Sequence, residues 1–412
     1  MTLPTQQAAT GEAGRGTVRE VAAAFLKLGM SSFGGPIAHL GYFHREFVER
    51  RRWLDERHYG HLVALCQFLP GPASSQVGFS IGLIRAGWLG GLAAFLCFTL
   101  PSALLLLAFA SLSDRLHGPL GTAAIHGLKL VAVAVVAQGV HAMAGRLAPD
   151  RNRALLAAAA AGLVVVGNSA PVQLGVVAGG AVLGLGLCRN VEHVADESFP
   201  LTYGRGAASV MLFGFAVLLL LALFASPRWP DLVQVGAGFY RSGSLVFGGG
   251  HVVLPLLQHD VVGRGWVSND AFLAGYGAAQ AVPGPMFSVA AYLGDQVHGG
   301  RGGLAGAGVG LLGIFLPGLL LVAGALPLWR SLARREAATR MLAGVNAAVV
   351  GLLAAALYNP VWISAVRSPL DVAIALVGFA MLAGARWSPL AAVFWCVTAS
   401  IASTLAGWTA VV

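Results

Sequence analysis

Charged residues are scarce in this sequence. Of its 412 residues only 10% are Asp, Glu, Lys or Arg, whereas 57% are hydrophobic, and the mean hydropathy is +0.75. Average soluble domains contain about 25% charged residues, so a shortage of this size excludes an ordinary soluble enzyme or binding domain. The composition therefore predicts an integral membrane protein.

Cysteine is scarce as well, and the spacing of the cysteines fits neither a disulfide framework nor a metal-binding motif. There are four cysteines: Cys66, Cys97, Cys188 and Cys396. They are too far apart for a disulfide framework or a metal-binding motif, so we interpret them as packing residues. His58 and His61 have no third ligand at the spacing of a metal site. The sequence predicts neither a metal nor a cofactor.

The motifs of several enzyme and pump classes are missing. No phosphate-binding loop, nucleophile elbow or zinc protease motif stands in a supporting context, and no soluble nucleotide-binding domain is evident, which disfavours an ATP-driven pump. The 26 Lys and Arg exceed the 17 Asp and Glu. They are scattered through loops between apolar runs, and this distribution disfavours nucleic-acid binding.

Glycine, in contrast, is abundant, with 56 residues, and it interrupts the first apolar segment. Residues 25–43 form an apolar segment that is cut at its centre by Phe33-Gly34-Gly35-Pro36. Pro36 lacks an N–H and disfavours a helical residue before it, while glycine permits unusual backbone, so we expect two half-helices with the second starting at Pro36. The N-terminus of such a half-helix attracts anions.

The same feature recurs later in the chain as Phe247-Gly248-Gly249-Gly250. Further matches follow in the same order: Trp53 with Trp266, Gln67 with Gln280, Pro70-Gly71-Pro72 with Pro283-Gly284-Pro285, Leu100-Pro101 with Leu316-Pro317, and Gly127 with Gly344. Because so many matches in one order are improbable by chance, the chain is predicted to contain two homologous halves.

This paired pattern resembles the chromate ion transporter family in its long form, which has two fused halves. The resemblance covers nearly the whole chain after residue 20. Its specific part is the pair of Phe-Gly-Gly motifs, each followed by a Trp and then by a Gln shortly before a Pro-Gly-Pro. The resemblance implies a polytopic membrane protein that exports chromate, driven by the electrochemical gradient of the membrane, and it leaves open other tetrahedral oxyanions.

The apolar segments divide the chain into four parts. We expect a disordered cytoplasmic tail at 1–18, a first transmembrane repeat at 19–187, a polar linker at 188–206 and a second repeat at 207–412. The first half holds an even number of crossings, and an extra apolar run at 207–226 opens the second, so the repeats should be inverted. The predicted fold is an all-α polytopic membrane protein, with broken or re-entrant helices at the Phe-Gly-Gly and Pro-Gly-Pro motifs.

The arginines favour re-entrant segments over crossing ones. If all four broken segments return to the side they came from, the arginine-rich loop at 44–57 lies inside with most other arginines. The arginines left outside are then Arg115, Arg228, Arg264, Arg301 and Arg367. If every broken segment crosses, the cluster of Arg146, Arg151 and Arg153 falls opposite that loop, which fits the positive-inside rule less well.

Candidate substrate-binding residues lie around the breaks. Lys27, Lys129 and Arg241 are the basic residues inside the apolar segments, where charge is costly and indicates function, with snorkelling to the interface as the alternative. Lys27 and Arg241 occupy matching places in the two repeats and are expected to hold a dianion between them. The Phe-Gly-Gly breaks add Ser31, Ser32, Gly34, Gly35, Ser244, Gly248 and Gly249, and the Pro-Gly-Pro turns add Gln67, Ser75, Gln280 and Ser288.

Other roles are open for several of these residues. The polar side chains at the breaks either bind substrate or satisfy freed backbone groups. His39 and His251 could carry protons near neutral pH or form structural hydrogen bonds. Asp295 is a candidate proton carrier, a partner for Arg241, or a helix-end residue in a loop.

Three functions therefore compete. The first is a secondary active exporter of chromate in the inner membrane, which would confer chromate resistance. The second is a carrier of sulfate or another divalent oxyanion, because a site of N–H groups and cations discriminates poorly between tetrahedral dianions. An intramembrane enzyme is the third, and it is disfavoured because the titratable groups are isolated. The expected partners are the oxyanion and the lipid bilayer, and a homodimer is left open.

Overall fold

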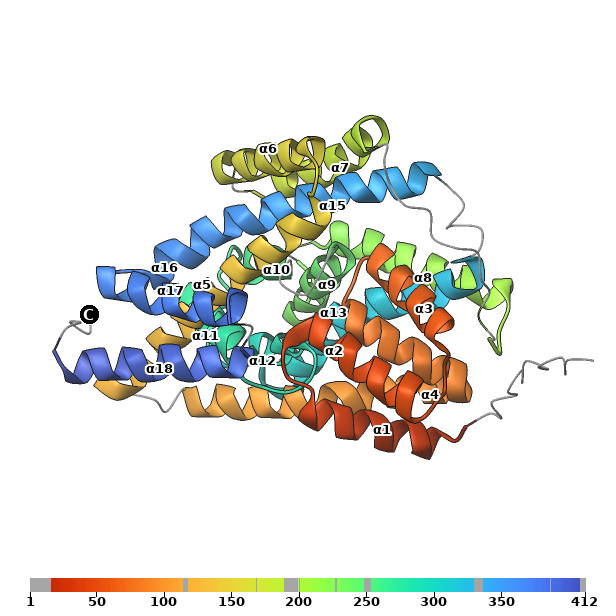
Figure 1. Cartoon of the computed structure of the whole chain (residues 1–412), viewed down its shortest axis with the longest axis horizontal. Helices are drawn as coiled ribbons and strands as arrows, with labels where there is room; N and C mark the ends of the chain where they lie inside the picture. Colours follow the sequence, from red (N-terminus) through yellow and green to blue (C-terminus); the bar gives the residue numbers. More distant parts are fainter. Residues whose placement is uncertain are drawn as a thin grey trace, which may run out of the picture.

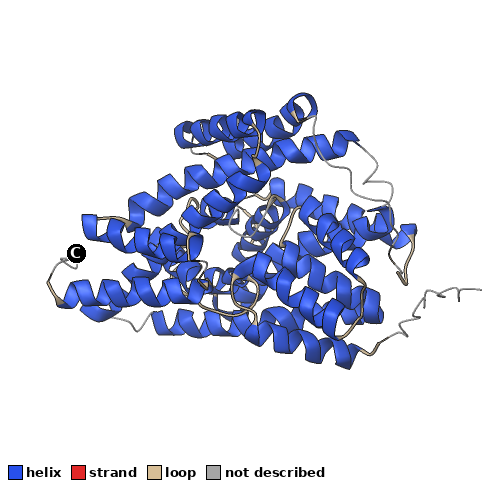
Figure 2. Ribbon diagram, viewed as in Figure 1, coloured by secondary structure: helices blue, strands red, loops and turns tan. Residues whose placement is uncertain are grey.

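The protein is all-helical, as predicted. The computed structural model describes residues 16–113, 118–167, 169–188, 199, 201–226, 228–247, 253–329, 336–385 and 387–407, and within these ranges it contains helices, turns and loops but no strand (Figures 1 and 2). Gly248, Gly249 and His251, which the sequence marked as candidates, lie outside the described residues. So do residues 1–15 of the predicted tail and most of the predicted linker.

The first half contains α1 to α7. Their bounds are α1 Val18–Ser31, α2 Gly35–His44 with a π-helical extension Arg45–Arg50, α3 Glu56–Phe68, α4 Ala73–Ser113, α5 Pro119–Leu147, α6 Arg151–Gly167 and α7 Ala170–Leu187. Helix α4 is kinked at Ala86 and Gly87, which have non-helical backbone angles. It therefore consists of a short helix that completes the second broken segment and a long apolar helix.

The second half contains α8 to α18. The bounds are α8 Arg205–Leu223, α9 Asp231–Ser244, α10 Val253–Val261, α11 Asn269–Ala279, a 3-10 turn Met286–Ser288 leading into α12 Val289–Asp295, α13 Gly303–Ala325, α15 Glu336–Ala356, a π-helical turn Leu357–Trp362 leading into α16 Ile363–Ala365, α17 Pro369–Ala383 and α18 Pro389–Leu405. Across the described residues, five helices are long and apolar enough to cross a membrane.

The breaks predicted at Gly34-Gly35-Pro36 and at the two Pro-Gly-Pro turns lie where the glycines and prolines placed them. Helix α1 ends at Ser31, and α2 starts at Gly35 with Pro36 in its first turn. Gly34 and Gly35 have φ of 106° and 77°, the left-handed region that other residues rarely adopt. The central glycines of the two Pro-Gly-Pro turns, Gly71 and Gly284, are left-handed as well, at 122° and 98°.

Both broken segments of the first half turn back on themselves. Phe25 of α1 stacks on Phe47, which follows the break, with ring centroids 4.9 Å apart. Glu20, at the start of α1, lies 3.9 Å from Arg51 and 3.4 Å from Arg85. Since Arg51 follows the first broken segment and Arg85 follows the second, both segments return to the end from which they started. This return is the geometry of re-entrant segments.

The second broken segment of the second half, from α11 to α12, makes the same return. The backbone N–H of His298, after α12, donates to the carbonyl of Trp266, after α10, at 2.8 Å. Trp266 is the counterpart of Trp53, and an arginine two residues earlier stacks on each ring: Arg51 lies 5.2 Å from Trp53, and Arg264 lies 5.3 Å from Trp266. These equivalent contacts confirm the repeat in three dimensions.

The last helices of each half pack on a helix of the other half. Helices α6 and α7 of the first half pack on α15 of the second, and α17 and α18 pack reciprocally on α5 (Figure 1). Gly127 and Gly344, predicted as counterparts, lie at equivalent contacts: Gly127 abuts the backbone of α18 at Cys396 and Val397, and Gly344 abuts the backbone of α7 at Gly180 and Gly184. A side chain at either position would separate the helices, because close backbone approach requires small residues.

Candidate anion site

The breaks of the two halves meet at two reciprocal hydrogen bonds. The N–H of Gly71 donates to the carbonyl of Val246 at 2.7 Å, and the N–H of Gly284 donates to the carbonyl of Ser32 at 2.9 Å. Ser32 and Val246 directly precede the two Phe-Gly-Gly motifs. Each Pro-Gly-Pro turn is therefore bound to the broken segment of the other half. We call Ser32, Gly71, Val246 and Gly284 the central junction.

One long helix from each half, α4 and α13, packs against the glycine turns of this junction. A Cβ on Gly284 would lie 3.0 Å from Ser102 Oγ in α4, and a Cβ on Gly71 would lie 2.9 Å from the Cα of Gly318 in α13. Ser102 and Gly318 follow the matching Leu-Pro pairs, so these contacts too are equivalent. Both turns need glycine, because the backbone is left-handed and the neighbouring helix leaves no space.

The junction is lined by buried hydroxyl groups that differ between the halves. Ser288 Oγ lies 2.6 Å from Ser102 Oγ, so these two hydroxyls satisfy each other. The counterpart of Ser288 is Ser75, and the counterpart of Ser102 is Gly318, which has no hydroxyl. Ser75 Oγ is accordingly buried with no partner among the described residues. This asymmetry leaves one donor free in the first half.

Two more buried polar atoms beside the junction have no partner in the described part of the chain. The Ser32 hydroxyl is fully buried and unpaired. His39 is also fully buried; its Nδ1 lies 3.4 Å from Ser74 Oγ, its ring packs edge-on against Phe98, and its Nε2 is unpaired. A buried donor without an acceptor costs about 1–3 kcal/mol. An oxyanion at this place would satisfy such donors.

A glutamine that the sequence analysis missed helps to hold the junction. Gln76 is fully buried, and its Nε2 donates to the carbonyls of Pro70 and Gly318, each at 3.0 Å. This side chain therefore joins the first Pro-Gly-Pro turn to α13. The predicted Gln67, by contrast, is exposed at the end of α3, and its counterpart Gln280 is buried with Nε2 3.0 Å from Met286 Sδ.

Several other candidates lie away from the junction. Lys27 and Ser31 are exposed on α1, and Ser31 Oγ donates to the carbonyl of Lys27 at 2.8 Å. Ser244 is buried, and its hydroxyl donates to the Tyr240 carbonyl at 2.7 Å. Asp295 ends α12 and accepts a hydrogen bond from Gln296 at 3.3 Å. The structure therefore brings together Ser32, Gly34, Gly35, Ser75, Ser288 and His39 from the predicted set, around the breaks and the central junction.

Arg241 has a carboxylate partner that the sequence analysis did not identify. The suggested pairing with Asp295 was wrong: the Arg241 guanidinium forms a two-pronged ion pair with Asp260 of α10 and also donates to the Ala222 carbonyl of α8 at 3.1 Å. Ser242 Oγ donates to the same carboxylate at 2.8 Å. The charge of Arg241 is thus compensated, and the pair ties α8, α9 and α10 together.

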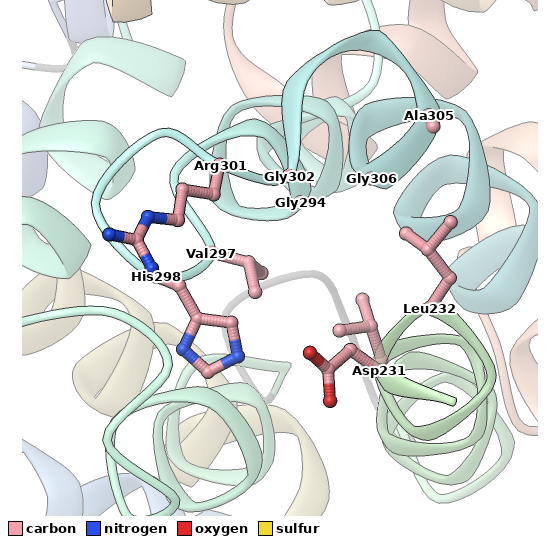
Figure 3. A pocket seen from close by; sticks show the side chains of 10 residues that line it. Asp231, Leu232, Gly294, Val297, His298, Arg301, Gly302, Ala305 and Gly306 are labelled. Atoms are coloured by element: carbon pink, nitrogen blue, oxygen red, sulfur yellow. The ribbon is translucent and has the colours of Figure 1, made fainter. Parts of the chain in front are cut away.

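The two halves differ at the corresponding segments that lead into the long part of α4 and into α13. Arg85 and Arg301 each stand two residues before a left-handed glycine, Gly87 and Gly303. In the first half Arg85 lies 3.4 Å from the Glu20 carboxylate. In the second half Arg301 lines a cavity of about 510 Å³ with Asp231 and His298, and Figure 3 shows Asp231 across the cavity from His298 and Arg301. We call the end held by these ion pairs the sealed end and the end with the cavity the open end; the residues that line this cavity include none of the central junction.

Ion pairs also fix the polar loop at the sealed end. The Glu46 carboxylate lies 2.6 Å from Arg51 and 2.9 Å from Arg50. Burial raises the pKa of Glu46, but hydrogen bonds and charge from the two arginines outweigh burial and hold that pKa below its usual value. Glu46 is therefore a stable anion around which this loop is organised.

The geometry defines a polytopic membrane protein of two homologous halves whose broken helices meet at its centre. Sequence comparison then gives the family. A model described as "Chromate transporter" matches residues 19–185 and 233–405, so the chain belongs to the chromate transporter family. The first matched region runs from α1 to α7 and the second from α9 to α18, and α8 lies between them.

Named relatives agree with this assignment. A chromate transport protein of Pseudomonas aeruginosa is 28% identical over 401 residues, covering 94% of this chain and 91% of the relative. One from Cupriavidus metallidurans is 27% identical, covering 89% and 87%, and an uncharacterized transporter of Methanocaldococcus jannaschii is 24% identical, covering 80% and 81%. No solved structure matches.

Proposed function

We propose that this protein is a secondary active carrier that exports chromate across the inner membrane, driven by an electrochemical gradient, and thereby confers chromate resistance. The observation that supports it best is the central junction, with the unpaired hydroxyls of Ser32 and Ser75 and the buried His39 ring beside it. Broken helices that meet at the centre of two repeats are where secondary transporters bind their substrates. The N-terminus of α2 adds the positive end of a helix dipole.

We further propose that the repeats are inverted, with the sealed end cytoplasmic and the open end outside. Residues that the arginine count assigned inside, such as Arg51 and Arg85, lie together at the sealed end. Arg301, assigned outside, lines the open cavity. In the proposed orientation the cavity at the open end faces outward.

Cysteines introduced at Glu49 and Arg264 test this orientation, because both positions are exposed, Glu49 in the π-helical extension of α2 and Arg264 in the turn after α10. With Cys97, the one native cysteine that is not buried, replaced by serine, a membrane-impermeant maleimide should label Glu49→Cys only in inverted vesicles and Arg264→Cys only in intact cells. Labelling of both from one side would refute the inverted repeat.

Transport itself is measured as radiolabelled chromate uptake into inverted vesicles. We expect uptake above that of vesicles lacking the protein, and we expect the difference to vanish when ionophores collapse the ion gradients. Uptake equal to the control would refute the proposed function. Faster uptake of sulfate than of chromate would instead identify a sulfate carrier.

A further inference from the structure

A second polar cavity lies at the other end of α12 from Ser288. Its volume is about 320 Å³, and it forms where α4 ends, α5 and α11 begin, α12 ends and the chain enters α17. Its polar lining includes Thr122, His126, Lys129, Asp270, Gln296 and Arg367. Every one of these segment ends lies outside in the proposed topology. The cavity is therefore on the exit side for an exported anion.

Two acid–base pairs line or border this cavity, and one of them, His126 with Asp371, is held in place by further hydrogen bonds. Asp371 is 2% exposed, and it accepts hydrogen bonds from His126 at 2.8 Å and from the backbone N–H groups of Arg367 and Ser368, both at 3.0 Å. The carboxylate also completes the capping box of α17. With three donors and almost no exposure, Asp371 is a fixed structural anion.

The other pair, Lys129 and Asp270, can separate. The Lys129 side chain is only 5% exposed, whereas that of its partner Asp270 is 61% exposed, with Lys129 Nζ 2.6 Å from Asp270 Oδ1. Lys129 is the partner that the structure shows for this carboxylate. A buried ammonium needs a counter-ion, and a solvent-facing carboxylate can turn away at little cost. Another anion can therefore replace the Asp270 carboxylate beside Lys129.

From these observations we infer that the cavity is a second oxyanion site, in which a small tetrahedral dianion displaces Asp270 from Lys129. Arg367 lines the same cavity and supplies a second cation, and among the described residues no acidic side chain pairs with its guanidinium. The site is specific to one half, because the counterpart of Lys129 is the neutral Asn346. The inference rests on the proposed function: when Asp270 returns to Lys129, the exported anion is released outward.

Ala271 lines the cavity beside Asp270 and provides a probe that does not depend on transport. In a purified, reconstituted Ala271→Cys protein with Cys97→Ser, we would compare modification by anionic and cationic methanethiosulfonates. Sulfate is the protecting ligand, because chromate oxidises thiols. In the Asp270→Asn background, we expect sulfate to slow modification of the cysteine at a concentration about tenfold or more below the concentration needed in the parent. We also expect the ratio of the modification rate by the anionic reagent to that by the cationic reagent to rise.

Lys129→Met in the Asp270→Asn background should abolish protection by sulfate, and Lys129→Arg should retain it. A neutral thiosulfonate controls for folding, since its rate should change little in any variant. Protection that survives Lys129→Met, or that weakens in Asp270→Asn, would overturn the inference. If vesicles show no chromate transport while sulfate protection persists, the proposed function fails and the site stands. If transport is normal while sulfate gives no protection, the second site is absent and the proposed function stands.

Discussion

Replacing Ser32 by alanine is expected to lower chromate transport by about ten- to a hundredfold without lowering thermal stability. The buried hydroxyl has no partner among the described residues, so its removal takes away an unsatisfied group and is neutral or stabilising for folding. A hydrogen bond to a charged ligand contributes about 1.5–3 kcal/mol, which corresponds to the expected loss. Transport in vesicles and thermal unfolding in detergent measure the two effects separately.

Ser244→Ala is the matched control. Ser244 is also buried in a broken segment, but its hydroxyl is already bonded to the Tyr240 carbonyl. Its removal should leave transport within about twofold of the parent, because an i−4 bond of this kind adds little to a helix. If Ser32→Ala transports normally, or if it is destabilised like a residue with a structural bond, the junction does not bind the anion through this group.

The positions of the breaks could be predicted from sequence because they depend on local chemistry. Gly34 and Gly35 are left-handed and Pro36 lies in the first turn of α2, as a Gly-Gly-Pro run requires. The repeat was predictable for a related reason: its motifs recur in order. What no local pattern specifies is which half each Pro-Gly-Pro turn would contact. The bonds from Gly71 to Val246 and from Gly284 to Ser32 join segments about 170 to 250 residues apart.

The exposure of Lys27 could have been predicted. Val21, Ala24, Phe25 and Leu28 are the buried face of α1, and they follow the i, i+3, i+4, i+7 spacing of an amphipathic helix. Lys27 falls outside that stripe, so helical periodicity alone would have placed it on the exposed side. Matching the two repeats by position drew attention to Lys27 and Arg241 together, although their surroundings differ.

Gln76 was missed for a different reason. It stands in the first turn of α4, four residues beyond Pro72, where the repeat offers no glutamine counterpart to draw attention to it. Its role depends on contact with Gly318, which is distant in sequence. Gln67 was chosen because Gln280 matches it, yet one is exposed and the other buried. Homologous positions in the two halves thus share backbone geometry more faithfully than side-chain function.

Replacing Asp260 by asparagine is expected to destabilise the protein by about 3–5 kcal/mol, because it leaves the Arg241 guanidinium partly buried without a counter-charge. Asp260 is 4% exposed and also accepts from Ser242, so the loss is not repaired by water. Thermal unfolding in detergent should show a large fall in midpoint. Asp231→Asn, which alters an exposed carboxylate at the start of α9, is the control and should change the midpoint little.

The double variant Arg241→Gln with Asp260→Asn decides between a structural and a substrate-binding role for Arg241. Two neutral amides of similar shape can hydrogen-bond to each other, so stability should recover substantially compared with either single variant. If Arg241 only holds α8, α9 and α10 together, chromate transport returns with stability. A double variant that folds like the parent yet transports no chromate would show that the guanidinium also meets the anion, as its place in the repeat suggested. Because Asp260 already holds two prongs of that guanidinium in this structure, we expect transport to return.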